Sequence, residues 1–177
     1  MPAGSFSSIP TVSLAGWRAE GADRASFANE LVSICHEVGF FTLVDHGIDP
    51  ATIEHWKQTV ARFFALPEDD KARIEKYRSR HFRGWERVGA ELTNNRVDYR
   101  EQVDLSTENP AYPLDVEPTY LLLDGPNQWL PEHVLPGYRA TVTDWFGCMK
   151  ALADELMGIL AVGLGLPADT FEKAFGE

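Results

Sequence analysis

The chain has 177 residues, of which 44% are hydrophobic and 24% are charged, as is typical of a globular protein with one core. Its formal net charge of −11 argues against the basic surface that binding to nucleic acid or to anionic lipid requires. The composition therefore predicts one folded domain with an acidic surface, and neither a nucleic-acid nor a membrane partner.

The first residues, MPAGSFSSIP, contain neither a basic segment nor a long apolar run, and no stretch of about 18 uncharged apolar residues follows. We therefore expect no signal peptide and no transmembrane helix, and a cytoplasmic location by default. Cys35 and Cys148 lie far apart on apolar positions of predicted helices, so we expect buried free thiols.

We expect residues 1–8 to form a flexible tail and residues 9–14, which alternate apolar and polar, to form a short strand. Asp23 is a predicted N-cap of a helix whose apolar residues recur at three- and four-residue steps, and Gly39 ends that helix. The continuous apolar run Phe40 to Val44 predicts a strand that is buried on both faces.

Asp49-Pro50 predicts the start of a second helix, which Pro67 stops, and residues 68–74 suit a further helical turn. Residues 77–96 are rich in Arg, Gly and polar side chains, which predicts an irregular loop.

Residues 97–105 alternate, which predicts a strand with one apolar face that Glu101 interrupts. The apolar face comprises Val97, Tyr99, Val103 and Leu105, and the polar face Asp98, Arg100, Gln102 and Asp104.

The proline-rich residues 106–135 predict a long connection, a length that is uncommon unless the loop has a function. A long helix is predicted from Pro136 to the GLGLP segment, with Gly147 and Gly158 marking close packing inside it. Residues 168–175 suit a last helical piece.

The five histidines offer no HxxxH, HxxE or HxD pair, so the residues alone assign no metal ligand. His46 is expected to hydrogen-bond within a turn, and His36 and His55 to lie at the surface. His81 and His133 lie in predicted loops and are weak candidates for substrate contact. With no GxSxG and no phosphate-binding loop, the sequence contains no complete catalytic constellation.

A family resemblance adds what these residues alone do not. EVGFFTLVDHGI, with IPTVSL before it and ARFFALPEDDKARI after it, resembles the start of the isopenicillin N synthase-like oxygenases. The likeness continues through FRGWERVGAELTNNRVDYREQVDL, through GPNQWL, which is similar to a GxNxWP loop, and through LPGYR to a helix that ends in LGL. The matches keep the family's order and cover residues 9–175.

The resemblance implies an α+β fold, in which a helix-rich N-terminal region with a few strands packs on and extends a double-stranded β-helix, or jelly-roll, core. Family members are iron(II)-dependent and mostly 2-oxoglutarate-dependent enzymes. Their core holds iron through an HxD pair and a distant second histidine, and an arginine binds the 2-oxoglutarate carboxylate. Oxidative decarboxylation of 2-oxoglutarate then drives oxidation of a substrate C–H bond.

None of those ligands occurs in this sequence, so the resemblance implies that residues 9–177 are the N-terminal region of an enzyme whose core lies beyond Glu177. The parent enzyme would use Fe(II) and 2-oxoglutarate to hydroxylate, desaturate or cyclise a small organic molecule. We expect neither cofactor to bind this chain alone, and catalytic and metal-binding residues to be absent from it. An open strand edge near residues 97–105 predicts self-association.

The same resemblance places tentative substrate-binding residues in the loop before that strand, at Arg83, Trp85, Glu91 and Thr93. Arg83 could pair with a substrate carboxylate, and Glu91 could accept a hydrogen bond from a cationic or hydroxyl group. The bland alternative is that Trp85 belongs to the core and that the other three are solvated. A second hypothesis for the whole chain is a free-standing, non-catalytic binding or dimerisation module derived from the family.

Overall fold

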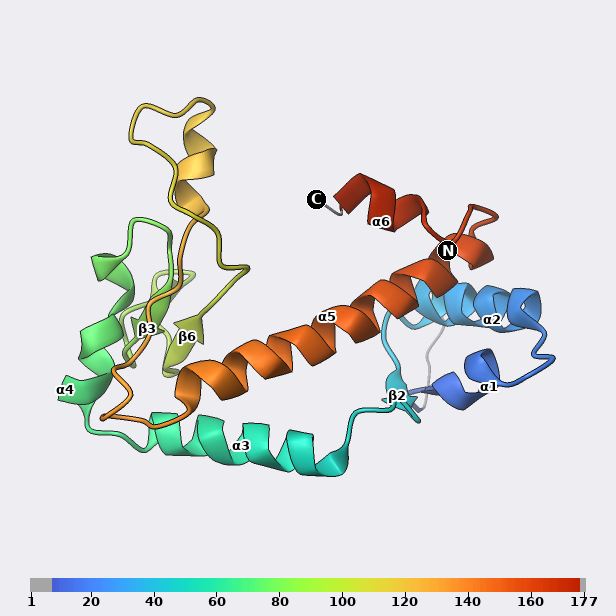
Figure 1. The fold of residues 1–177 in the computed structure, drawn as a ribbon, viewed down its shortest axis with the longest axis horizontal. Coiled ribbons are helices and arrows are strands. Elements are labelled where there is room, and N and C mark those ends of the chain that lie inside the picture. Colours follow the sequence, from blue (N-terminus) through green and yellow to red (C-terminus); the bar gives the residue numbers. More distant parts are fainter. Residues whose placement is uncertain (1–7, 176–177) are drawn as a thin grey trace. The chain divides into compact units, whose positions relative to one another are not determined.

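The computed structural model describes residues 8–175, and Figure 1 traces their helices and strands. They fall into two compact units, the described parts of Met1–Ile53 with Asp144–Glu177, and Glu54–Thr143. Both units contain helices and strands, which confirms the mixed α+β class. Apart from Ser8, the predicted tail over residues 1–8 lies outside the described residues.

The first unit opens with a parallel pair of short strands, β1 (Thr11–Ser13) and β2 (Thr42–Val44). The helix α1 (Leu14–Arg18) follows β1 directly, which the alternating pattern of residues 9–14 did not predict. The prediction of a strand buried on both faces over Phe40–Val44 is wrong, because pairing begins at Thr42 and the side chain of Phe40 is 50% exposed. Within the described residues β2 has β1 as its partner strand, and Thr42 is exposed.

Helix α2 (Arg24–Glu37) begins and ends as predicted. The Asp23 side chain accepts a hydrogen bond from the Ser26 amide at 3.0 Å, and Gly39 has φ +88° just past the helix end. The core of this unit joins β1, α1, α2 and the C-terminal part of α5 (Tyr138–Gly163). Its buried members are Val12, Leu14, Ala28, Leu31 and Ile159.

The long predicted helix is α5, and it is followed by α6 (Thr170–Phe175). The prediction of close packing at Gly147 is wrong, because a Cβ at that position would meet nothing within 4 Å. A Cβ at Gly158 would make only ordinary contact with the Ala168 oxygen, at 3.5 Å, so Gly158 is not tightly packed either. The tight position is Gly163, where a Cβ would clash with the backbone oxygen of Ala28. The absence of a side chain at Gly163 therefore lets the end of α5 lie against α2.

The second unit takes in most of α3 (Pro50–Phe64), which Asp49 caps by accepting a hydrogen bond from the Ala51 amide at 2.9 Å. The predicted further turn is α4 (Glu68–Lys71) with a 3₁₀ turn behind it. Figure 1 shows the two strands β3 and β6 side by side in this unit. Its strands are β3 (Gly84–Glu86), β4 (Leu92–Thr93), β5 (Arg96–Val97) and β6 (Gln102–Asp104).

Residues 77–96 are not the irregular loop that the sequence predicted, and residues 97–105 are not one strand. β4 and β5 form a hairpin that turns on Asn94 and Asn95, with φ of 52° and 60°, values typical of a type I′ turn. β6 instead pairs antiparallel with β3. Because the chain leaves one pairing to join another, Tyr99 is 86% exposed rather than part of an apolar face.

The connection over residues 106–135 contains a 3₁₀ turn over Thr119–Leu123. It is fixed to the rest of the unit by polar contacts. Arg80 donates to the Tyr112 oxygen at 2.8 Å, and the buried His81 lies with Nδ1 at 2.9 Å from the Leu122 oxygen. His81 thus has a structural partner.

The core of the second unit lies between α3, β3 and the start of α5. Phe63 and Tyr138 stack with ring centroids 5.1 Å apart, and Trp129 meets Tyr138 edge to face at 6.0 Å. Burial raises the pKa of Tyr138 to about 12. In the part of the chain that the structure describes, no helix is both long and apolar enough to cross a bilayer.

Gly163→Ala should lower the free energy of unfolding by about 2 kcal/mol, because the new methyl group must displace the backbone of α2. Gly147→Ala in the same helix should instead raise it by up to about 1 kcal/mol, since alanine favours a helix and the space is open. Urea unfolding of the two variants and the parent measures both. Equal effects of the two substitutions would contradict the packing described at Gly163.

Candidate functional site

The sheet of β3 and β6 has a core face that is held in place by a buried charge. The ammonium of Lys71, whose side chain is 6% exposed, donates to Glu101 Oε2 at 2.7 Å and to the Phe64 oxygen at 3.2 Å. The same Glu101 oxygen accepts a hydrogen bond from Trp85 Nε1 at 2.9 Å. Glu101, which interrupts the apolar pattern of its segment, therefore joins α4 to β3.

At the start of β3, Gly84 is required by both space and backbone. It has φ +124°, and a Cβ there would clash with the Ile74 oxygen. Beside it the side-chain amide of Gln128 donates to the oxygens of Ile74, Glu75 and Arg83 at 3.3, 3.0 and 2.7 Å. This close approach brings residues 75 and 76 alongside β3, where the backbones of Glu75 and Trp85 form an isolated parallel β-bridge.

The opposite face of the sheet carries a cluster of charges around Lys76, whose side chain is 10% exposed. Its ammonium lies 2.8 Å from Asp104 Oδ2, 3.0 Å from Glu86 Oε2 and 3.6 Å from Glu91 Oε1. It also lies over the ring of Phe82, 3.8 Å from the centroid. Burial by itself would lower the pKa of Lys76, but the hydrogen bonds to Asp104 and Glu86 outweigh it and raise this pKa.

Two further donors fix the carboxylates of this cluster. The Gln102 amide reaches Glu91 Oε1 at 3.0 Å and Glu86 Oε2 at 3.2 Å, and Arg100 donates to Glu91 Oε2 at 2.8 Å. The hydrogen bond from Arg100 lowers the pKa of Glu91, so this carboxylate is ionised at neutral pH. Glu91, which directly precedes β4, is thereby tied to Gln102 of β6.

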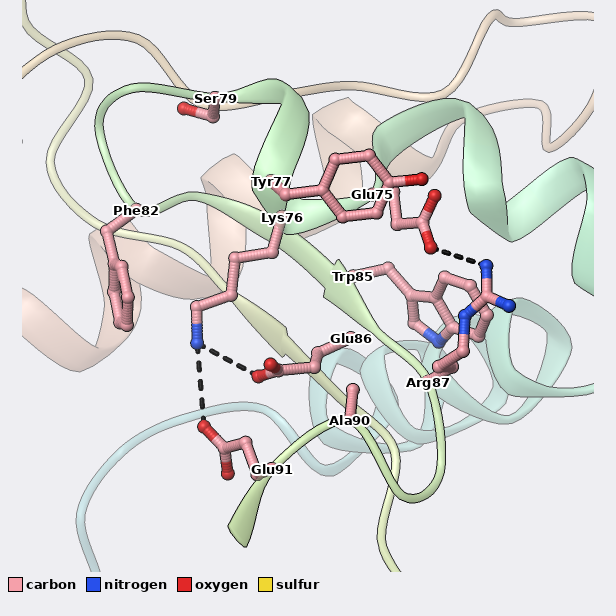
Figure 2. Close-up of a pocket in the computed structure, with 10 residues that line it drawn as sticks. All are labelled: Glu75, Lys76, Tyr77, Ser79, Phe82, Trp85, Glu86, Arg87, Ala90 and Glu91. Atoms are coloured by element: carbon pink, nitrogen blue, oxygen red, sulfur yellow. Dashed lines mark hydrogen bonds and ion pairs between the residues drawn. The ribbon is translucent and has the colours of Figure 1, made fainter.

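A cavity of about 530 Å³ opens beside these charges, within the range of small-molecule sites. Figure 2 shows Lys76 pointing between Phe82 and Glu86, while Tyr77, Trp85 and Arg87 lie on the other side. The remaining residues that line it are Glu75, Ser79, Ala90 and Glu91.

On the side of the cavity where Tyr77 and Trp85 lie, Glu75 is buried and paired with Arg87. The hydrogen bond from Tyr77, followed by that from Arg87, lowers the pKa of Glu75. The Arg87 guanidinium lies 5.9 Å from the centre of the Trp85 ring. The cavity thus combines aromatic surface with carboxylates whose charges are held in fixed positions.

The four residues predicted from the sequence reach different places. Glu91 lines the cavity, and so does Trp85, which is also a buried member of the core, as the alternative predicted. The Arg83 guanidinium donates to the His81 oxygen at 2.7 Å, and its buried Nε has no hydrogen-bond partner among the described residues. Thr93 is exposed at the end of β4, beside the hairpin turn. The structure therefore brings two of the four to one cavity.

Sequence reasoning missed the residues that make up most of the charge cluster. Gln102 and Asp104 belonged to the polar face of a predicted alternating strand, and that face was the signal for them. Lys76, Phe82 and Glu86 lie in or beside the predicted irregular loop, and no pattern in the sequence marks them.

The histidines and cysteines lie outside this cluster. His46 accepts a hydrogen bond from the Ile48 amide at Nδ1, 3.1 Å away, as predicted for its turn. His36 and His55 are exposed as predicted, and so is His133. Cys35 and Cys148 are free thiols, but both are partly exposed rather than buried.

Iron is the metal that the family resemblance implies, and the donors near the cavity do not suit it. Among residues 8–175, no three or more His, Cys, Asp and Glu side chains are arranged to hold a metal ion. The carboxylates of Glu86, Glu91 and Asp104 instead surround an ammonium, without an imidazole.

Glu101→Ala should lower the free energy of unfolding by about 3 kcal/mol, because it leaves the Lys71 ammonium buried without its counter-charge. Guanidinium chloride unfolding measures this. Asp154→Ala is the matched control, since it removes the partner of the exposed Lys150 and should cost about 0.5 kcal/mol or less. A loss at Glu101 no larger than that of the control would show that Lys71 does not need this partner.

Comparisons with known proteins identify the relatives of this chain. The family model described as "non-haem dioxygenase in morphine synthesis N-terminal" matches residues 9–132. The 2-oxoglutarate-dependent dioxygenase frbJ of Dothideomycetidae sp. (strain 11243) is 36% identical, over 97% of this chain and 45% of that protein. A 2-oxoglutarate-dependent dioxygenase of Gibberella zeae is 31% identical, over 99% of this chain and 45% of its own length.

Among solved structures, that of a full-length Neurospora crassa protein in complex with alpha-KG superposes with a TM-score of 0.74 and 25% sequence identity. The match covers 93% of this chain and 49% of that protein. The chain thus spans about half the length of the relatives that it matches. These matches agree with the motifs over residues 9–175, and the chain belongs to the family of 2-oxoglutarate- and iron(II)-dependent non-haem dioxygenases, within which it matches the N-terminal region.

Proposed function

We propose that this chain is the N-terminal part of an iron(II)/2-oxoglutarate-dependent oxygenase that oxidises a small organic molecule. The match of a 36% identical dioxygenase to 97% of this chain but only 45% of that relative carries the proposal. In it, residues 9–177 support a jelly-roll core that supplies the iron ligands and the 2-oxoglutarate site. Bound there, iron and 2-oxoglutarate would supply the oxidising power, and succinate would be a product.

In this proposal the polar face of β3 and β6 is the part of the chain that meets the substrate. The cavity of about 530 Å³ opens on that face, where Glu91 lines it, and it also borders Trp85, whose side chain is buried in the core. Arg83 and Thr93 flank the same segment and would contact substrate once the core is in place. Relatives are named for acting on homoarginine, naringenin and 1-aminocyclopropane-1-carboxylate, all small organic molecules.

The reaction type follows from the core rather than from this region. Hydroxylation, desaturation and ring closure all begin by breaking a substrate C–H bond, and the position of that bond relative to the iron decides among them. The residues of this chain would orient the substrate.

Succinate formation tests the oxygenase proposal. A protein expressed from the complete coding sequence should convert 2-oxoglutarate to succinate only when iron(II) is added, because the proposed core needs both. The 177-residue chain under the same conditions should form none, nor should it develop a metal-to-ligand absorption band on titration with iron(II) and 2-oxoglutarate. If the complete protein formed no succinate, the oxygenase proposal would be overturned. If the 177-residue chain bound iron(II) and 2-oxoglutarate stoichiometrically, the expectation that this chain alone binds neither would be wrong.

The alternative, a free-standing binding or dimerisation module, is favoured by the exposed apolar side chains of the hairpin segment. Leu92, Val97 and Tyr99 are 64%, 46% and 86% exposed. In the oxygenase proposal the core covers them, and in the module a second copy would do so. A coding sequence that continues past Glu177 into an HxD motif supports the oxygenase, whereas a stop codon there supports the module.

Self-association of the 177-residue chain through this segment follows from either reading, because exposed strand edges and apolar side chains pair readily. Sedimentation velocity should show dimers or larger species whose fraction rises with protein concentration. Tyr99→Ser should reduce that fraction, while Tyr120→Ser, at another exposed tyrosine (68% exposed), should not. If the unsubstituted 177-residue chain were strictly monomeric, this surface would not mediate self-association.

A further inference from the structure

We propose that the Lys76 side of the cavity, lined by Phe82, Glu86 and Glu91, selects an organic amine, that is, a ligand with a flat apolar part and a protonated nitrogen, over neutral and anionic ligands. The inference rests on the proposed function, since it names the class of substrate that the proposed site would take.

The walls of the cavity suit a flat apolar group. Phe82 and Tyr77 are 58% and 77% exposed, so their surfaces are available to a ligand, whereas Trp85, which also lines the cavity, is 1% exposed. Large aromatic side chains left open around a cavity of this volume are the usual surroundings of a small ring-containing ligand.

The cations at the cavity are already bound to carboxylates. The Lys76 ammonium has three N–H groups, and three carboxylates lie around it at 2.8, 3.0 and 3.6 Å. Arg87 pairs with the buried Glu75, on the side of the cavity away from Lys76 in Figure 2. At Lys76 a ligand carboxylate would have to displace one of these partners, which is unfavourable, whereas Arg87 is half exposed and has N–H groups besides the one bonded to Glu75.

The carboxylates, by contrast, can accept further hydrogen bonds. Each carboxylate offers about four lone-pair sites, more than the contacts at Glu86 and Glu91 fill. The lining of the cavity also carries excess negative charge, because the three carboxylates of Glu75, Glu86 and Glu91 face the two cations Lys76 and Arg87.

The site already binds one ammonium group. Lys76 Nζ lies 3.8 Å from the centre of the Phe82 ring and against the carboxylates. A ring face next to carboxylates is the environment that stabilises an alkylammonium ion. A ligand amine entering beside Lys76 would meet Glu86 and Glu91, both of which line the cavity.

Three ligands that share a phenyl ring and differ in the polar group test the inference: phenethylamine, 2-phenylethanol and 3-phenylpropionate. Binding to the full chain, without metal, is followed by the NMR signals of the Glu86 and Glu91 backbone amides, since both residues line the cavity. The amine should bind about tenfold more tightly than the alcohol, because a charged hydrogen bond is the stronger, and the carboxylate should bind most weakly. Added salt should weaken the binding of the amine alone.

Glu86→Gln should reduce affinity for the amine about tenfold and leave affinity for the alcohol unchanged. Asp154→Asn removes the same charge from the other unit and should change neither. Equal affinities for amine and alcohol, binding of the carboxylate as tight as that of the amine, or no shift with any ligand at about 10 mM would overturn the inference. Because this assay needs neither iron nor 2-oxoglutarate, its failure is distinguishable from a failure to form succinate.

Discussion

A single buried ammonium determines how the second unit is assembled. Lys71 leaves α4 and enters the core, where a charge without a partner would cost several kcal/mol. Glu101 supplies that partner and also accepts the indole hydrogen bond of Trp85. The segment before β6 is therefore held against both α4 and β3. Glu101 interrupts the apolar pattern of residues 97–105, and its contacts with Lys71 and Trp85 hold this segment in position.

This arrangement divides the sheet of β3 and β6 into two chemically different faces. Trp85, Val103 and Leu105 lie on the core side, whereas Glu86, Gln102 and Asp104 lie on the side of Lys76. The tie at Glu101 fixes the register of the first face, and a fixed register determines which side chains reach the second. The stability of the core and the arrangement of charges at the cavity are thus consequences of one pairing.

The helices of this fold could be predicted from the sequence, and the strands largely could not. Helix signals are local: the caps at Asp23 and Asp49 and the long apolar stripe of α5 were found where the structure has them. The strands are only two or three residues long, so the alternating patterns located β1 within residues 9–14 and β6 within residues 97–105 but gave neither their bounds nor their partners. Asn94-Asn95, whose residues tolerate positive φ, is a hairpin signal that the prediction of an irregular loop overlooked.

The candidate site was harder still to predict, because long-range contacts create it. Lys76 meets Glu86 ten residues away and Asp104 still farther along the chain, through a backbone approach that Gly84 and Gln128 permit. Family resemblance directed attention to Trp85 and Glu91, which line the cavity, and to Arg83 and Thr93, which do not. The family resemblance thus identified the segment that contains the site, but only the folded structure shows which of its side chains reach the cavity.

The hairpin of β4 and β5 can vary in length and sequence while the sheet of β3 and β6 keeps its structure. Its turn has two residues, and it is joined to β6 by the side chains of Arg100 and Gln102 that reach Glu91. Doubling the length of a flexible loop costs only about 0.6 kcal/mol of closure entropy, far less than the loss of a core contact. Insertions at this hairpin would therefore alter the surroundings of the neighbouring Glu91, which lines the cavity, while the sheet and its buried charge stay intact. Among related chains, differences in substrate should accumulate first in the length and sequence of this hairpin.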